Sequence, residues 1–254
     1  MNVDNRYTDE MVAFRRSIHE HPETGWTEFR TTSIIVKRLK ELGFEVLEGL
    51  QAVNPDFVMG RYPEEVKAAK KRALEEGVSE ADLDAMQGYT GAIGIWRTGR
   101  PGPVSALRFD IDALFVPETK DPNHIPNKCG FASKHPGQMH ACGHDCHTGV
   151  GLAIAHWIAD HSDELCGTIK LLFQPAEEGT RGAMAMAQTG VLDDVDNLIA
   201  SHIACTPRLG EVTVTDPGYN ATIKFDVHFE GLPAHSVANP QDGRNALMAA
   251  CHTA

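Results

Sequence analysis

One stretch decides the fold of this 254-residue chain: Val104-Ser105-Ala106-Leu107-Arg108-Phe109-Asp110-Ile111-Asp112. It begins as an apolar run that is typical of a buried strand, and it ends in two aspartates. Because side chains alternate along a strand, Asp110 and Asp112 are expected on the same face. The stretch therefore predicts a strand that carries acidic side chains at its carboxyl end.

Strands and helices alternate around this stretch. The strand is expected at 104–111 and further strands at 92–96, 168–173 and 198–203, with helices at 147–158 and 182–188 between the later ones. This alternation predicts an α/β fold with a mostly parallel sheet and helices on both faces. Ligands bind beyond the carboxyl ends of the strands in such sheets. The polar clusters that follow the strands are therefore candidates for one shared site.

The residues before this alternation predict more helix than strand. Apolar residues recur at helical spacing across 10–42, with a break at His21-Pro22 and an end at Gly43, and a short strand is expected at 44–47. Residues 50–90 look like a helical insertion. Within it, a charged helix is expected to begin at Pro63. The run from Ser79 to Asp82 resembles a capping box that opens a second short helix. Such a pair of helices is expected to be a solvated surface feature without a role in chemistry.

The pattern changes again after Pro217. A half-exposed strand is expected at 221–229, a Gly/Pro loop at 231–235 and a helix at 245–253. We therefore predict a first domain over 1–217, which includes the insertion, and the beginning of a second, α+β domain over 218–254.

Composition excludes several classes of partner. The net charge of −12 gives no electrostatic reason to bind nucleic acid or an anionic membrane. The six cysteines contain no C-x-x-C pair, so we expect mostly reduced thiols. The N-terminus lacks the apolar core of a signal peptide, and the longest mostly apolar run, 149–159, is too short to cross a bilayer. A cytoplasmic enzyme is the expectation.

The densest chemistry lies in the run His140-Ala141-Cys142-Gly143-His144-Asp145-Cys146-His147. Gly143 allows a tight turn, so that the Cys142 thiolate and the His144 imidazole can face one point. Thiolate and imidazole are ligands that suit zinc and its neighbours, whereas carboxylates also admit manganese. A metal site is favoured, although a catalytic Cys–His pair or a merely polar turn would also explain these residues.

Two more clusters follow predicted strands. Adjacent side chains point in different directions, so one carboxylate of the Glu177-Glu178 pair can bind a metal while the other holds a water. The alternative is an acidic helix N-terminus. Asp112 can orient a ligand histidine, bridge two metals or cap the next turn. His202 ends an apolar strand and is a candidate ligand in this company, although a lone histidine there is more often a satisfied core residue.

These motifs resemble a known family. The segments 15–25, 110–114, 140–147 and 174–179 are similar to the motifs of the dinuclear metallopeptidases that include aminoacylases, hippurate hydrolases and auxin-conjugate amidohydrolases. The insertion and the run 179–183 look closest to the p-aminobenzoyl-glutamate hydrolase branch. The resemblance implies a zinc-peptidase-like catalytic domain followed by a lid or dimerisation domain.

The resemblance also implies roles for single residues. Metal ligation falls to Cys142, His144, Glu178 and His202, and Glu177 would be the general base, assisted by Asp112. His235, in the second domain, would reach the partner subunit's site and stabilise the oxyanion. The implied cofactors are two divalent ions, manganese or zinc, and the implied assembly is a homodimer or a heterodimer with a related subunit.

The implied activity is hydrolysis of the amide bond of an N-acyl amino acid, with p-aminobenzoyl-glutamate as the expected substrate. A non-catalytic metal-binding or dimerisation module is the alternative. This chain differs from the family in two respects. Cys146 stands where the family usually has glycine, and the family has a further ligand histidine near the end of a much longer chain. The sequence ends before this histidine and before the second domain is complete, which is expected of a fragment, a truncated form or an incomplete gene model.

Overall fold

The computed structural model describes residues 5–203, 208–214 and 227–253. The chain divides into two compact units, 1–206 and 207–254, and each is described here by itself. The predicted domain assignment, with its boundary after residue 217, stays a prediction.

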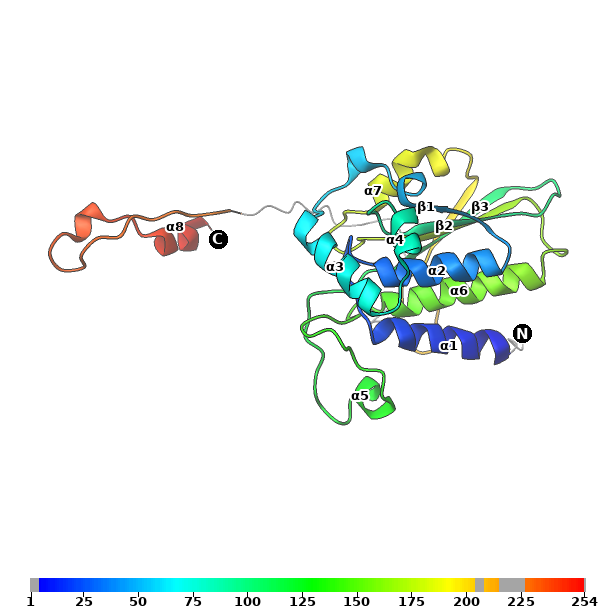
Figure 1. The fold of residues 1–254 in the computed structure, drawn as a ribbon, viewed down its shortest axis with the longest axis horizontal. Coiled ribbons are helices and arrows are strands. Elements are labelled where there is room, and N and C mark those ends of the chain that lie inside the picture. The colour runs from blue at the N-terminus through cyan, green and yellow to red at the C-terminus, as the bar shows by residue number, and fades with distance from the viewer. Residues whose placement is uncertain (1–4, 204–207, 215–226, 254) are drawn as a thin grey trace. The chain divides into compact units, whose positions relative to one another are not determined.

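The first unit is built on a five-stranded sheet in the order β1-β2-β4-β3-β5 (Figure 1). β3 is parallel to both of its neighbours, whereas β2 is antiparallel to β1 and β4. β2 therefore runs against the other four strands, and the predicted α/β fold with a mostly parallel sheet is confirmed. The strands are β1 Glu45–Glu48, β2 Ala92–Arg97, β3 Val104–Asp110, β4 Thr168–Gln174 and β5 Asn197–Ala200.

Helices cover both faces of this sheet. α2 and α6 pack on one face, with α1 against α6 (Figure 1), and α7 with the following π-helical turn covers the other. The helices are α1 Asn5–His19, α2 Phe29–Glu41, α3 Pro63–Glu75, α4 Glu80–Ala85, α5 Ile125–Cys129, α6 His144–Asp160, α7 Ala183–Met186 and α8 Ala246–Thr253; the π-helical turn is Ala187–Val191, and short 3-10 turns lie at Gly49–Gln51, Pro55–Phe57 and Pro240–Asp242.

Side chains point alternately to the two faces of the sheet along β4, and apolar residues occupy both faces. Leu171 and Phe173 are fully buried in the core beneath α2 and α6, whereas Leu172, which lies between them, packs in the opposite core with Met186 of α7. A strand that is buried on both faces reads as a continuous apolar run, which is how β4 appears in the sequence.

The insertion has an apolar side as well as a charged one. Val66, Ala69 and Leu83 are buried in a third cluster around Phe29 at the start of α2. The capping box at Ser79 is present: its hydroxyl accepts from the Asp82 N–H at 3.1 Å. The expected helices form, and the insertion is packed on the rest of the first unit through a small core of its own.

Most predicted boundaries shift by one or two residues, and three differences bear on the site. α6 begins at His144, three residues earlier than expected, and β3 and β5 end at Asp110 and Ala200, before the expected 111 and 203. His202 therefore lies in the segment after β5 rather than at the end of the strand. The strand expected at 221–229 falls mostly outside the described residues, and residues 227–229 have no regular secondary structure. In the ranges that the structure describes, no helix combines the length and the apolar character that crossing a bilayer requires.

The core predicts that a leucine-to-alanine substitution destabilises the fold more at a buried position than at an exposed one. Leu171→Ala, at a fully buried position, should lower the free energy of unfolding by about 2–5 kcal/mol, because a cavity remains in the core. Leu74→Ala in α3, at a position that is 41% exposed, should change the free energy of unfolding by less than about 0.5 kcal/mol. Urea denaturation of both variants checks this, and equal losses would contradict the core described above.

Candidate metal centre

The Asp112 carboxylate joins the three segments that form the centre. Its Oδ1 lies 3.2 Å from Nδ1 of His144 at the start of α6, and its Oδ2 accepts from the backbone N–H of Glu178 at 2.9 Å. Asp112 is 1% exposed, two residues after the end of β3. The predicted orienting role is the one that its contacts support.

His144 presents one nitrogen without a hydrogen-bond partner. Its side chain is fully buried, and Nδ1 donates to Asp112, so Nε2 carries the free lone pair. Within the described chain no group forms a hydrogen bond to this Nε2. An unsatisfied buried nitrogen is costly, and a metal ion would satisfy it. The orientation by a carboxylate is the arrangement typical of metal-bound histidines.

Two further ligand atoms surround this nitrogen. One ligand atom each from Cys142, His144 and Glu178 lie within 4.8 Å of one another. Thiolate, imidazole and carboxylate together suit a borderline divalent ion. The residues present therefore fit the metal site that the sequence predicted.

His202 approaches the same point from the segment after β5. Its Nδ1 donates to the Ile203 carbonyl at 2.5 Å, which leaves the Nε2 lone pair 3.4 Å from the Cys142 Sγ. Gly143 permits this approach, because a Cβ at that position would lie 2.1 Å from Cδ1 of Ile203, and its φ of +84° is accessible to glycine.

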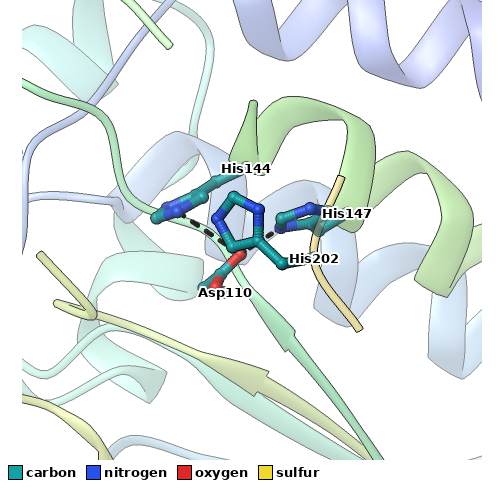
Figure 2. Close-up of side chains that lie close together, drawn as sticks. All are labelled: Asp110, His144, His147 and His202. Carbon is teal, nitrogen blue, oxygen red and sulfur yellow. Dashed lines mark hydrogen bonds and ion pairs between the residues drawn. The ribbon is translucent and has the colours of Figure 1, made fainter. Parts of the chain in front are cut away.

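Asp110 and His147 complete a second group of possible ligands, with His144 and His202 (Figure 2). His147 has both nitrogens engaged, however. Nε2 accepts from the Ile203 N–H at 2.8 Å, so Nδ1 must carry the proton that it donates to Asp110 at 2.5 Å. In this arrangement His147 supports the segment that carries His202 and offers no free lone pair.

Glu177 lies at the edge of the centre and is partly exposed. Its Oε2 is 3.9 Å from Nε2 of His144, and its Oε1 is 4.0 Å from Nη2 of Arg108. Arg108 also donates to Asp110 at 2.7 Å and to Gln174 at 2.7 Å. Glu177 thus stands beside the candidate ligands with a side chain that water can reach, as a general base requires.

The electrostatics of the centre favour a bound cation. Burial, and then the charges of Glu178 and Glu177, raise the pKa of the Cys142 thiol to about 12. Burial and the charge of Asp112 also raise the pKa of Glu178. Burial alone would lower the pKa of His144, but the hydrogen bond to Asp112 and the charge of Asp110 outweigh it and raise that pKa. Neighbouring carboxylates contribute to all three directions, after burial for Cys142 and Glu178 and against it for His144, and a divalent ion would neutralise their charge.

A strained turn presents Glu177 and Glu178. Ala176, just before them, is fully buried with a φ of +48°. Its N–H donates to the buried Glu28 carboxylate at 2.8 Å. After the turn, Arg181 donates from Nε to the Glu178 carbonyl at 2.9 Å and from Nη1 to the Gly60 carbonyl of the insertion at 2.8 Å.

The remaining polar residues of the 140–147 run are not among the grouped ligand atoms. Asp145 pairs with His19 at 2.9 Å and with Arg15 at 3.0 Å, so it ties α6 to α1. Burial lowers the pKa of His140 to about 4 and raises that of Cys146. His235 lies in the second unit, where its Nδ1 accepts from the backbone of Val237 and Ala238. Its role at the oxyanion stays a prediction.

Sequence reasoning did not find all of the supporting residues. Arg108 shares a strand face with Asp110, which was an available signal. Glu28 gave no comparable signal, because it lies 148 residues from Ala176 and only the tertiary fold brings the two together. Arg181 is only three residues from Glu178, but its residue type does not predict this contact.

The sequence profile of Peptidase family M20/M25/M40 matches residues 106–254, more than half of the chain. The chain belongs to this family. The suspected relationship to dinuclear metallopeptidases is thereby confirmed, and the match includes every predicted metal ligand.

Individual relatives agree with this assignment. A protein of Haemophilus influenzae, named as a homolog of one subunit of p-aminobenzoyl-glutamate hydrolase, is 48% identical over the whole of this chain, which spans 59% of that protein. The indole-3-acetyl-aspartic acid hydrolase of Enterobacter agglomerans is 48% identical over 96% of this chain and 57% of its own length. The chain thus spans less than two thirds of these curated relatives.

Solved structures show the same fold. An aminobenzoyl-glutamate utilization protein from Klebsiella pneumoniae matches with a TM-score of 0.72 and 36% identity over 97% of this chain and 56% of its own. The Bacillus subtilis protein YXEP, described as a dinuclear metal-binding peptidase of the M20 family, matches with a TM-score of 0.60 and 31% identity over 80% of this chain and 45% of its own.

The donor geometry predicts metal loss on removal of the thiol. Cys142→Ala should lower the affinity for zinc or manganese by more than about 10–100-fold, the range for loss of a residue that only orients a ligand, because one of three converging ligand atoms is gone. Elemental analysis and calorimetric titration of the full-length protein check this. Cys129→Ala, at an exposed thiol, is the matched control. Metal content that is unchanged in Cys142→Ala would refute ligation by this thiol.

Proposed function

We propose that the protein containing this chain is a metal-dependent amidohydrolase that cleaves the amide bond of an N-acyl amino acid. One observation carries the proposal: the buried, unpartnered Nε2 of His144 converges with Cys142 and Glu178, while Glu177 stands 3.9 Å away on the exposed side. The metal ligands in this proposal are Cys142, His144, Glu178 and His202, and the site takes two ions, either manganese or zinc.

A bound divalent ion would lower the pKa of a coordinated water to about 7 and polarise the amide carbonyl. The residues of this chain then divide the remaining work. Glu177 accepts the proton of the attacking water and later delivers it to the leaving amine. Asp112 holds His144 in the tautomer that keeps Nε2 unprotonated. His235, contributed by a partner subunit, stabilises the oxyanion that forms on the carbonyl.

The substrate that we propose is p-aminobenzoyl-glutamate. Support comes from relatives at 45–48% identity whose names describe one subunit of a hydrolase of this compound, or a homolog of that subunit. Because those names refer to one subunit of the hydrolase, they also support the presence of a partner subunit. We therefore propose a homodimer or a heterodimer with a related chain. A cytoplasmic location is part of the same proposal.

Two other functions fit the structure less well. A non-catalytic metal-binding or dimerisation module has no use for Glu177, a water-accessible carboxylate beside the ligands. A cysteine hydrolase requires an activated thiolate, whereas the pKa of Cys142 is raised to about 12 by burial and neighbouring carboxylates. Cys142 lies 3.4 Å from His202, but with this raised pKa its thiolate needs a neighbouring cation, and a metal ion that supplies this charge would bind the sulfur that a nucleophile must keep free.

The role of Glu177 predicts separation of metal binding from turnover. Glu177→Ala in the full-length protein should retain metal and lower kcat by at least about 100-fold, because the proton acceptor is lost. Glu75→Ala, at a 65% exposed glutamate of α3, is the control and should leave kcat unchanged. Turnover near that of the unaltered protein in Glu177→Ala would refute the assignment.

A substrate panel tests the rest of the proposal. Hydrolysis of p-aminobenzoyl-glutamate should exceed that of acetyl and benzoyl amino acids, with manganese or zinc added and a chelator abolishing turnover. Activity that resists chelation but falls with a thiol reagent would favour the cysteine mechanism instead.

A further inference from the structure

We infer that Glu28 is a positioning residue for the candidate metal centre: its buried carboxylate fixes the strained turn that aims Glu177 and Glu178. This inference rests on the proposed function, since it assigns the turn a role in holding metal. Glu28 itself lies outside the donor group.

Glu28 has two hydrogen bonds, and both connect distant segments. Oε1 accepts from the Ala176 N–H at 2.8 Å, and Oε2 pairs with the Thr90 hydroxyl at 2.6 Å, just before β2. The side chain is fully buried. Its carboxyl therefore ties the start of α2 to the entrance of β2 and to the turn after β4.

The turn depends on an anchor of this kind. Ala176 has a φ of +48°, a conformation that a residue with a Cβ rarely adopts unless its surroundings enforce it. Its carbonyl accepts from the N–H groups of Arg181 and Gly182. A Cβ at Gly25 would lie 3.0 Å from Ala176, so the turn is also packed from behind. Glu28 supplies the partner of the remaining polar group, the Ala176 N–H.

The backbone of Glu177 is consequently held from both sides. Glu28 binds the N–H of the residue before it, and Asp112 binds the N–H of Glu178 after it. Two buried carboxylates thus set the direction in which the Glu177 and Glu178 side chains leave the chain. Loss of either anchor should loosen the alignment of the ligand and the base together.

Conservative and apolar substitutions separate positioning from mere stability. Glu28→Gln keeps a carbonyl oxygen for the Ala176 N–H and is a neutral side chain, as Glu28 tends to be when burial and the charge of Asp112 raise its pKa to about 8. Glu28→Met keeps the volume but has no oxygen. In calorimetric titration of the full-length protein with manganese or zinc, we expect Glu28→Gln to bind like the unaltered protein and Glu28→Met to bind about tenfold more weakly.

Glu23→Met is the matched control. Glu23 is also fully buried, but it accepts from the N–H groups of Arg30 and Thr31 in the first turn of α2 rather than from the turn at Ala176. It should lower the melting temperature without lowering metal affinity. If Glu28→Met does not fold, Thr90→Val still tests the inference, because it removes one anchor of Glu28 at nearly constant volume and should weaken metal binding by a smaller factor.

Metal affinity that is unchanged in folded Glu28→Met or, failing that, in Thr90→Val would overturn the inference. An equal loss of affinity in Glu23→Met would also overturn it, because the effect would then follow from any lost buried carboxylate. If the unaltered protein binds neither metal, the proposed function itself is wrong, and the inference fails with it.

Discussion

The centre depends on the Asp112 carboxylate more than on any single candidate ligand. It binds His144 with one oxygen and the Glu178 N–H with the other, so it fixes two candidate ligands from different segments relative to β3. Since β3 and β4 are parallel and paired up to Asp110 and Gln174, the sheet brings these segments together at one edge. The register of β3 against β4 therefore sets where Asp112 and Glu178 lie relative to each other.

Buried acids recur throughout the surroundings of this centre. Asp110, Asp112, Asp145, Glu23 and Glu28 are all at most 1% exposed. Each accepts from an N–H group of the backbone or of a histidine, which offsets the cost of burying a carboxyl group. Glu28, just before α2, therefore belongs to the site's support although it contributes no ligand, whereas Glu23 supports the first turn of α2.

Most of the fold could be predicted because the strands carry strong apolar runs and the helices have recognisable ends. The reversed direction of β2 could not, since its apolar run is the same in either orientation. The candidate ligands Cys142 and His144 followed from residue type and a glycine turn. The contact between Glu28 and Ala176 did not, because it depends on where the tertiary fold brings a left-handed alanine.

β5 has a consequence for behaviour in solution. It is an edge strand whose only partner in the described part of the chain is β3, and Leu198 and Ile199 are more than half exposed. Such an edge can pair with another copy and begin aggregation. Asp194 and Asp196, just before it, are engaged within the chain, since Asp194 pairs with Lys170 and Asp196 accepts from the Val104 N–H at 2.8 Å. These two carboxylates are therefore not free to oppose such pairing at the exposed apolar side chains of β5.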